Sequence, residues 1–171
     1  MYDTTLLIEL MFRNMPKKKR IIFKETEKVE IIRNSDCCYI GMVDTDNNPY
    51  VIPFNFGYKD NCIYLHSGQS GRKIEILKKN NRVCVVFSIG HKVSAQNKDV
   101  ACSYIMSYKS VICYGKVEFI EEYDKKVEAM NIIMQQYTGR NFEYSAPSMN
   151  NVLTYKVVIE EMTAKEFGNL S

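Results

Sequence analysis

The spacing of the turn-forming residues constrains this chain more than any other feature. Strand-like runs at residues 37–43, 50–58 and 63–66 are separated by short clusters of turn formers such as residues 44–48. Connections of this length join antiparallel neighbours, whereas parallel strands need a much longer crossover. The pattern therefore predicts an antiparallel meander and disfavours a doubly wound parallel fold. Pro53 cannot donate a backbone hydrogen bond, so its strand is expected at a sheet edge or a distortion.

The rest of the chain completes a mainly β protein with about three short helices. Residues 89–103 follow neither the period of a strand nor that of a helix, which predicts a long loop. Thr26 is expected to cap the first helix, and Gly139 is expected to end the last one. Further strands are predicted at residues 82–87, 106–120 and 153–160, and helices are predicted to begin near Thr26, Gly71 and Val127.

These elements are expected to form one domain. A chain of 171 residues can bury a core large enough to fold without disulfides or metals. Six or seven strands joined mostly by tight turns predict an antiparallel barrel with helices at its ends. The domain is expected to span residues 21–171, and residues 1–20 are expected to be a loosely ordered N-terminal extension.

Composition argues against several classes of protein. Hydrophobic residues make up 46% and charged residues 25% of the chain, which indicates neither disorder nor a membrane protein. The apolar run at residues 6–11 is too short to cross a bilayer, and it precedes the basic cluster at residues 17–20, unlike a signal peptide. Six cysteines without an export signal indicate thiols in a reducing compartment. We therefore expect a cytoplasmic protein with no membrane association.

Neither a metal site nor a nucleic-acid interface stands out in the sequence. The chain has no C-x-x-C pair and only two histidines, His66 and His91, so no metal is expected. The net charge of +3 and the pI near 8.4 are mild for a nucleic-acid-binding protein. The basic cluster at residues 17–20 is expected to be solvated surface, with a small nucleic-acid-binding barrel kept as an alternative.

The stretch that carries chemistry leads from a strand end into a helix start. His66 and Ser67 end one predicted strand, and Gly71, Arg72 and Lys73 open the helix that follows. Backbone amides at a helix N-terminus carry partial positive charge, serine hydroxyls can donate, and arginine can bind a phosphate through two hydrogen bonds. These residues alone leave two interpretations open, namely an anion site or a capped helix with two solvated cations.

The order of these segments resembles the split-barrel flavin-binding family that includes pyridoxamine 5′-phosphate oxidase. The resemblance covers about residues 26–161 and includes residues 65–67, 71–73 and 80–83 in the same order. It implies an antiparallel split β-barrel that binds FMN, with the phosphate at the helix start and the isoalloxazine ring against the preceding strand. The cofactor-binding residues that it implies are Val51, Ile52, Pro53, Phe54, Asn55, Leu65, His66, Ser67, Gly71, Arg72, Lys73 and, from a later strand, Ser110.

Within that family the chain looks more like the nitroimidazole-resistance (Nim-type) branch than like the oxidases. The similarity lies in Pro-Phe-Asn-Phe-Gly-Tyr at residues 53–58, His-Ser at residues 66–67 and Met-Ser-Tyr-Lys-Ser-Val at residues 106–111. The chain has no Trp, and it lacks the arginine-rich C-terminal motif with which the oxidases bind their substrate. The similarity implies a homodimer with two FMN sites between subunits, a small nitro-aromatic or similar acceptor, and NAD(P)H as the electron source.

His66 is the candidate catalytic residue. In the Nim-type branch the histidine of this motif lies beside the flavin, and an imidazole that titrates near neutrality can deliver a proton while electrons are transferred. The alternative for His66 is a histidine that only hydrogen-bonds FMN or the barrel rim. For the whole protein, the alternative is a flavin- or haem-binding carrier of the same fold without turnover. His91, in the predicted loop, is expected at the surface.

Overall fold

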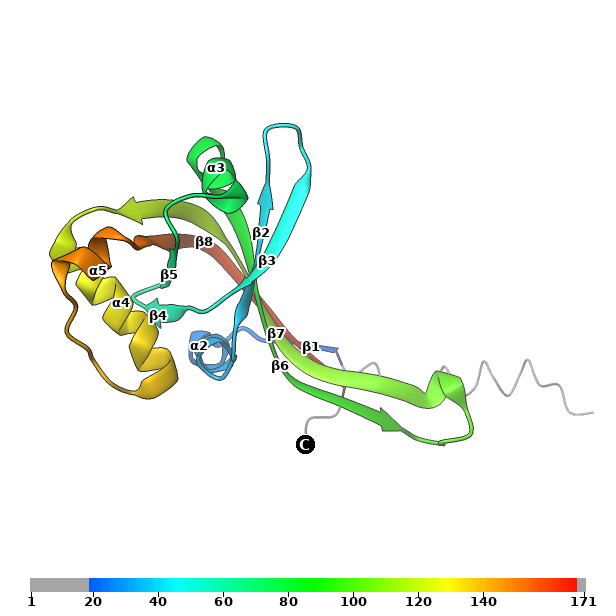
Figure 1. Ribbon diagram of the computed structural model, residues 1–171. Helices are drawn as coiled ribbons and strands as arrows, with labels where there is room; N and C mark the ends of the chain where they lie inside the picture. Colours follow the sequence, from blue (N-terminus) through cyan, green and yellow to red (C-terminus); the bar gives the residue numbers. More distant parts are fainter. Residues whose placement is uncertain (1–18, 169–171) are drawn as a thin grey trace, which may run out of the picture.

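One antiparallel sheet organises residues 19–168, the part of the chain that this computed structural model describes (Figure 1). The strands follow the order β3-β2-β6-β7-β8-β5-β4, and β1 pairs with β8. In chain order the elements are β1 Lys19–Ile21, α2 Glu25–Arg33, β2 Cys38–Val43, β3 Pro49–Phe54, β4 Gly57–Lys59, β5 Cys62–Ser67, α3 Arg72–Lys79, β6 Arg82–Ala95, the 3-10 helix η1 Ala101–Ser103, β7 Tyr104–Ile120, α4 Tyr123–Thr138, α5 Ala146–Asn150 and β8 Leu153–Phe167.

The mainly β, antiparallel fold predicted from the sequence is confirmed. All strand pairs are antiparallel, and residues 19–168 contain eight strands and four α-helices, against the six or seven strands and about three helices expected. The end strands β3 and β4 are not paired with each other, so the barrel is split rather than closed. The additional helix, α5, is five residues long, too short to show a helical period in the sequence.

The three-stranded meander expected at the start of the sheet is wrong, because residues 50–58 form two separate strands. β3 ends at Phe54 and is the edge strand beside β2, which agrees with the expectation for Pro53. β4 pairs with β5 at the opposite end of the sheet. The chain therefore crosses from one end of the sheet to the other within this short segment.

Packing against the core and against α4 explains this crossing. Phe56, between the two strands, is fully buried, and its ring centroid lies 4.8 Å from that of Phe87. Next to it, a Cβ on Gly57 would lie 2.6 Å from the backbone of Ile132 in α4. Because residue 57 is glycine, β4 can pack directly against α4. The chain therefore stops pairing with β2 after Phe54 and turns toward the helix.

The long loop expected at residues 89–103 is also wrong, because β6 continues to Ala95 and pairs with the start of β7. The register shifts between Ile89 and Lys92, where Gly90 adopts φ 69°. Such a bulge interrupts the alternation of side chains, so no single period fits the sequence. The outer part of the hairpin, residues 92–107, projects away from the body of the molecule, and we call it the arm (Figure 1).

The helix boundaries agree with the sequence in part. α2 begins at Glu25, with Lys24 at the cap position and no side-chain cap, so Thr26 does not cap it. Glu25 and Glu27 place negative charge in the first turn instead, which stabilises the helix dipole. α4 ends at Thr138, and Gly139 follows in a left-handed conformation with φ 65°, as predicted.

The core fixes the position of α3. Ile74, Ile76 and Leu77 are buried on its inner face and join the main hydrophobic core beneath the sheet. A second, smaller core surrounds Met130, Ile133 and Met149, between α4 and α5. Because three apolar side chains of a short helix are buried, the N-terminus of α3 is held in place beside the hairpin formed by β2 and β3 (Figure 1).

β1 brings the end of the expected N-terminal extension into the sheet. Lys19 and Arg20 pair with β8, and the Arg20 guanidinium donates to Glu166 at 2.8 Å and forms an ion pair with Glu27. Residues 1–18, which carry the rest of that expectation and half of the basic cluster, lie outside the described residues. Within residues 19–168 no helix combines the length and the apolar character needed to cross a membrane.

Candidate functional site

The start of α3 offers free backbone amides. Gly71 precedes the helix with φ 114°, a conformation that favours glycine, and a Cβ there would meet no atom within 4 Å beyond its chain neighbours. No side chain within residues 19–168 caps the helix, and its first bonded amides, those of Ile74 and Glu75, donate to Gly71 O at 2.9 and 3.2 Å. The amides of Arg72 and Lys73 have no acceptor among the described residues, so they are free to donate to an anion.

Two cations from the first turn of α3 lie over aromatic rings of β3. Arg72 Cζ lies 4.7 Å from the centroid of the Tyr50 ring, and Lys73 Nζ lies 5.0 Å from that of Phe54. Such contacts stabilise a cation by about 0.5–1 kcal/mol at an exposed site. The structure therefore brings the predicted helix start and the predicted strand together, with two positive charges between them.

Asp44, in the turn between β2 and β3, places a carboxylate beside this pair. Its Oδ1 accepts from the amides of Asn48 at 2.9 Å and Asp46 at 3.0 Å, and its Oδ2 lies 3.7 Å from Arg72 Nη2. The hydrogen bonds from Asn48 lower the pKa of Asp44, and the charge of Arg72 lowers it further. The sequence correctly predicted a turn at Asp44, but nothing in it indicated the contact with Arg72.

His66 lies on β5, opposite Thr154 of β8. Its Nδ1 is buried and has no hydrogen-bond partner within residues 19–168. Burial lowers the pKa of His66 below its usual value of 6.5, and the positive charge of Lys73 lowers it further. The imidazole is therefore neutral at pH 7, with a polar nitrogen that the chain itself leaves unsatisfied.

Tyr155, on β8, is not among the site residues predicted from the sequence. It lies next to the end of β5. Its side chain is fully buried, and its hydroxyl has no hydrogen-bond partner in the described part of the chain. Burial raises the pKa of this hydroxyl to about 12, against an opposing effect of the neighbouring Ser67 hydroxyl. Ser67 donates instead to Gly68 O at 2.9 Å. The sequence pattern predicted the final strand, but it could not predict that the hydroxyl of Tyr155 would lack a hydrogen-bond partner among the described residues.

The other residues predicted on β3 and β5 differ in which of their atoms are accessible to a ligand. Val51 is 62% exposed and Pro53 is also exposed, so both lie on the outer face of the edge strand. Ile52 lies on the other face, and Asn55 is exposed just after the strand. Leu65 is fully buried in the core, so only its backbone is available to a ligand.

Ser110 is the one predicted cofactor residue that lies apart from the others. It is buried in β7, opposite Ser88 of β6 and Lys165 of β8. Strands β2 and β6 separate β7 from β3, so along the sheet the two strands are about 14 Å apart at the usual strand spacing. Within one chain, Ser110 therefore does not join the cluster at the start of α3.

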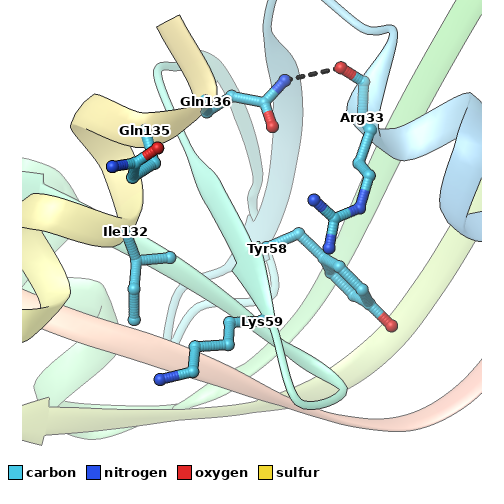
Figure 2. Close-up of a pocket in the computed structure, with 6 residues that line it drawn as sticks. All are labelled: Arg33, Tyr58, Lys59, Ile132, Gln135 and Gln136. Carbon is cyan, nitrogen blue, oxygen red and sulfur yellow. Dashed lines mark hydrogen bonds between the residues drawn. The ribbon is translucent and has the colours of Figure 1, made fainter. Parts of the chain in front are cut away.

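A cavity of about 430 Å³ opens elsewhere, between the end of α2, β4 and α4 (Figure 2). Gln136 Nε2 donates to Arg33 O at 2.7 Å across its rim, and Lys59 is paired with Glu128 at 2.8 Å. The residues that line it are Arg33, Tyr58, Lys59, Ile132, Gln135 and Gln136. None of the residues predicted from the sequence to bind a cofactor is among them.

His91 lies at the surface, as predicted. Its side chain is exposed, its Nε2 lies 2.8 Å from Ser88 Oγ, and its ring stacks on Tyr108 with the centroids 6.5 Å apart. Within residues 19–168 no three His, Cys, Asp or Glu side chains gather in a group that could hold a metal ion.

Comparison with known proteins places the chain among relatives of this fold. A crystal structure of a candidate 5-nitroimidazole antibiotic resistance protein from Bacteroides thetaiotaomicron is 46% identical, with a TM-score of 0.79 over 88% of this chain and 89% of that one. The flavocytochrome Anf3 from Azotobacter vinelandii is 17% identical, with a TM-score of 0.73 over 89% of this chain and 70% of that one.

A third structure, of an FAD-binding protein from Mesorhizobium loti, is 22% identical, with a TM-score of 0.64 over 88% of this chain and 99% of that one. At these lower identities, the second and third structures support the fold alone. No curated protein matches the chain. The model of the family described as pyridoxamine 5′-phosphate oxidase matches residues 24–166, which confirms the resemblance seen in the sequence. This chain therefore belongs to the pyridoxamine 5′-phosphate oxidase family.

Proposed function

We propose that this chain is a cytoplasmic FMN-dependent oxidoreductase. It would act as a homodimer and reduce a small oxidised acceptor, such as a nitro-aromatic, with electrons from NAD(P)H. The observation that carries the proposal is the start of α3, where Arg72 and Lys73 lie over the rings of β3. Lys73 also acts on His66, whose Nδ1 has no hydrogen-bond partner in the described part of the chain. The 46% identity to a candidate nitroimidazole resistance protein supports the class of acceptor.

The residues at this site fit a flavin mononucleotide. The free amides of Arg72 and Lys73, their two side-chain charges and the Ser67 hydroxyl suit a phosphate. The segment from Val51 to Asn55, at the end of β3, would lie against the ring system, offering the exposed backbone of an edge strand. The redox chemistry would be supplied by the flavin, while the chain binds and orients it.

His66 would handle a proton at this site. Because its pKa is lowered, the imidazole is neutral at pH 7, and the unpartnered Nδ1 can donate or accept a hydrogen bond according to tautomer. We propose that Nδ1 holds a hydrogen bond to the bound flavin or to the acceptor, and that the neutral ring relays a proton, taking one up from water at one nitrogen as it releases one from the other. His66→Ala should leave the flavin bound and slow turnover.

An exposed apolar face of the sheet supports the homodimer. Val51 is 62% exposed, Tyr39 49% and Tyr114 46%, and they lie on the neighbouring strands β3, β2 and, beyond β6, β7. A contiguous apolar face of this kind is typical of a protein–protein interface. Ser110 lies four residues before Tyr114 on the same face of β7, so a second copy could bring it to the flavin of its partner.

Purified protein tests the proposal directly. We expect a yellow protein that releases FMN on denaturation, identified by chromatography against FAD, and that bleaches a nitro-aromatic when NAD(P)H is added. Bound flavin without turnover would favour the carrier, and a Soret band would favour a haem-binding module. Colourless protein with strongly salt-dependent binding to oligonucleotides would overturn the proposal in favour of a nucleic-acid-binding barrel.

A further inference from the structure

The side chain of Tyr155 is fully buried, and its hydroxyl has no hydrogen-bond partner among residues 19–168. Buried polar groups almost always have a hydrogen-bond partner, and leaving one unsatisfied destabilises the fold. Phenylalanine would fill the same space without this cost. The ring of Tyr155 packs edge-on against Phe54, with centroids 6.4 Å apart, and against Phe119 at 5.6 Å. Packing therefore explains the ring of Tyr155 but not its hydroxyl.

The position of this hydroxyl points to the start of α3. Tyr155 lies opposite Leu65 in the ladder between β5 and β8, two residues before the strand ends at Ser67. Phe54, which contacts the Tyr155 ring, also lies beneath the ammonium group of Lys73. The buried hydroxyl therefore lies near Ser67, and the Tyr155 ring is linked through Phe54 to Lys73 of the proposed phosphate site.

Ser67 can connect the hydroxyl to a ligand. Its hydroxyl now donates to Gly68 O at 2.9 Å, at the beginning of the loop that leads to α3. A serine hydroxyl can rotate, and its oxygen can accept one hydrogen bond while its proton is donated to another group. Tyr155 Oη is fully buried, whereas its neighbour Ser67 keeps 9% of its surface exposed at the end of β5, so a ligand would contact Ser67 rather than Tyr155.

We infer that Tyr155 is a positioning residue for phosphate binding, which acts through Ser67. In the bound state, Tyr155 donates to Ser67 Oγ, and Ser67 turns its proton from Gly68 O to a phosphate oxygen. A chain of two hydroxyls polarises each bond and fixes the direction of the outer one. This inference rests on the proposed function, because it assigns a further residue to the same flavin site.

The test compares two ligands that differ only in the phosphate. FMN and riboflavin are titrated into the full chain freed of flavin, and binding is followed by flavin fluorescence. Tyr155→Phe should weaken FMN binding about three- to tenfold, the effect of losing one hydrogen bond, and leave riboflavin binding unchanged. Thermal unfolding of the flavin-free variant should show no loss of stability, since the described part of the chain gives the hydroxyl no hydrogen-bond partner.

Tyr144→Phe is the matched control. Its hydroxyl is also buried without a partner among residues 19–168, but the ring packs against the second core near Met130 and Met149. It should leave the affinity for both flavins unchanged. A second control repeats Tyr155→Phe in a Ser67→Ala background, where its further effect on FMN binding should fall below about twofold.

The outcomes separate this inference from the function on which it rests. If the unmodified chain binds neither flavin, the proposed function is wrong. If it binds FMN but Tyr155→Phe behaves like Tyr144→Phe, the role of Tyr155 is wrong and the function stands. The inference also fails if Tyr155→Phe weakens riboflavin equally, or if its effect persists in full without the Ser67 hydroxyl.

Discussion

Two adjacent side chains concentrate positive charge at the start of α3. Arg72 and Lys73 contact separate rings of β3, Tyr50 and Phe54, so each is directed toward the space beside that strand. Asp44 offsets part of the charge of Arg72 at 3.7 Å. The affinity of the site for an anion is therefore expected to depend on these two residues more than on the other cations of the helix.

We predict that Arg72→Ala combined with Lys73→Ala weakens FMN binding by more than about 100-fold, because hydrogen bonds to charged groups contribute about 1.5–3 kcal/mol each. Lys78→Ala combined with Lys79→Ala, in the last turn of the same helix, is the control and should change the affinity little. Fluorescence titration measures both. Full retention of FMN by the first variant would contradict the phosphate assignment.

His66 makes stability depend on pH in a defined direction. Its pKa is lowered in the folded chain by burial and by Lys73, whereas the unfolded chain has the usual value near 6.5. As the pH falls below 6.5, the unfolded chain takes up a proton before the folded chain does, so the free energy of unfolding decreases. We expect His66→Asn to remove this loss. The decrease in Tm from pH 8 to pH 5 should therefore be smaller for the variant than for the unmodified chain.

At the scale of elements, β4 depends on glycine for its position. The Cβ that Gly57 lacks would lie 2.6 Å from backbone atoms of Ile132 in α4. We predict that Gly57→Ala destabilises the fold by about 1–3 kcal/mol, the usual cost of overpacking. In Gly41→Ala, the nearest atom would be Cys84 O at 3.5 Å, so this control should change the urea midpoint much less. Equal midpoints for the two variants would contradict the close packing of β4 on α4.

The sequence correctly predicted those element boundaries that depend on residues close by in the chain. The start of α3 and the end of α4 follow from Gly71 and Gly139, whose effects act within one turn of helix. The break after Phe54 depends on α4, which lies far away in the sequence, and the extension of β6 depends on pairing across a bulge. The contacts of Asp44 with Arg72 and of Tyr155 with Phe54 could not be predicted either. Each joins residues that are far apart in the sequence and become neighbours only in the folded chain.

At the scale of the whole molecule, the exposed sheet face predicts the oligomeric state. Val51→Asp places a charge at the edge of the apolar face formed with Tyr39 and Tyr114, where a second copy would bury it. We expect this variant to shift the protein from dimer to monomer in sedimentation experiments and to lose FMN as well. Phe142→Asp, in the connection between α4 and α5, is the control and should remain dimeric. A Val51→Asp protein that stays dimeric would contradict this choice of interface.

The arm has a consequence for local unfolding. Within residues 19–168, the segments 92–95 and 104–107 pair only with each other, and a two-stranded hairpin alone is marginally stable in water. Amide hydrogens there should exchange with solvent much faster than those of the same strands where β6 pairs with β2 and β7 pairs with β8. A protease should cut first at the tip near residues 96–103. Slow exchange along the arm would mean that another surface covers it. Deuterium uptake can therefore report whether the arm is exposed to solvent or covered.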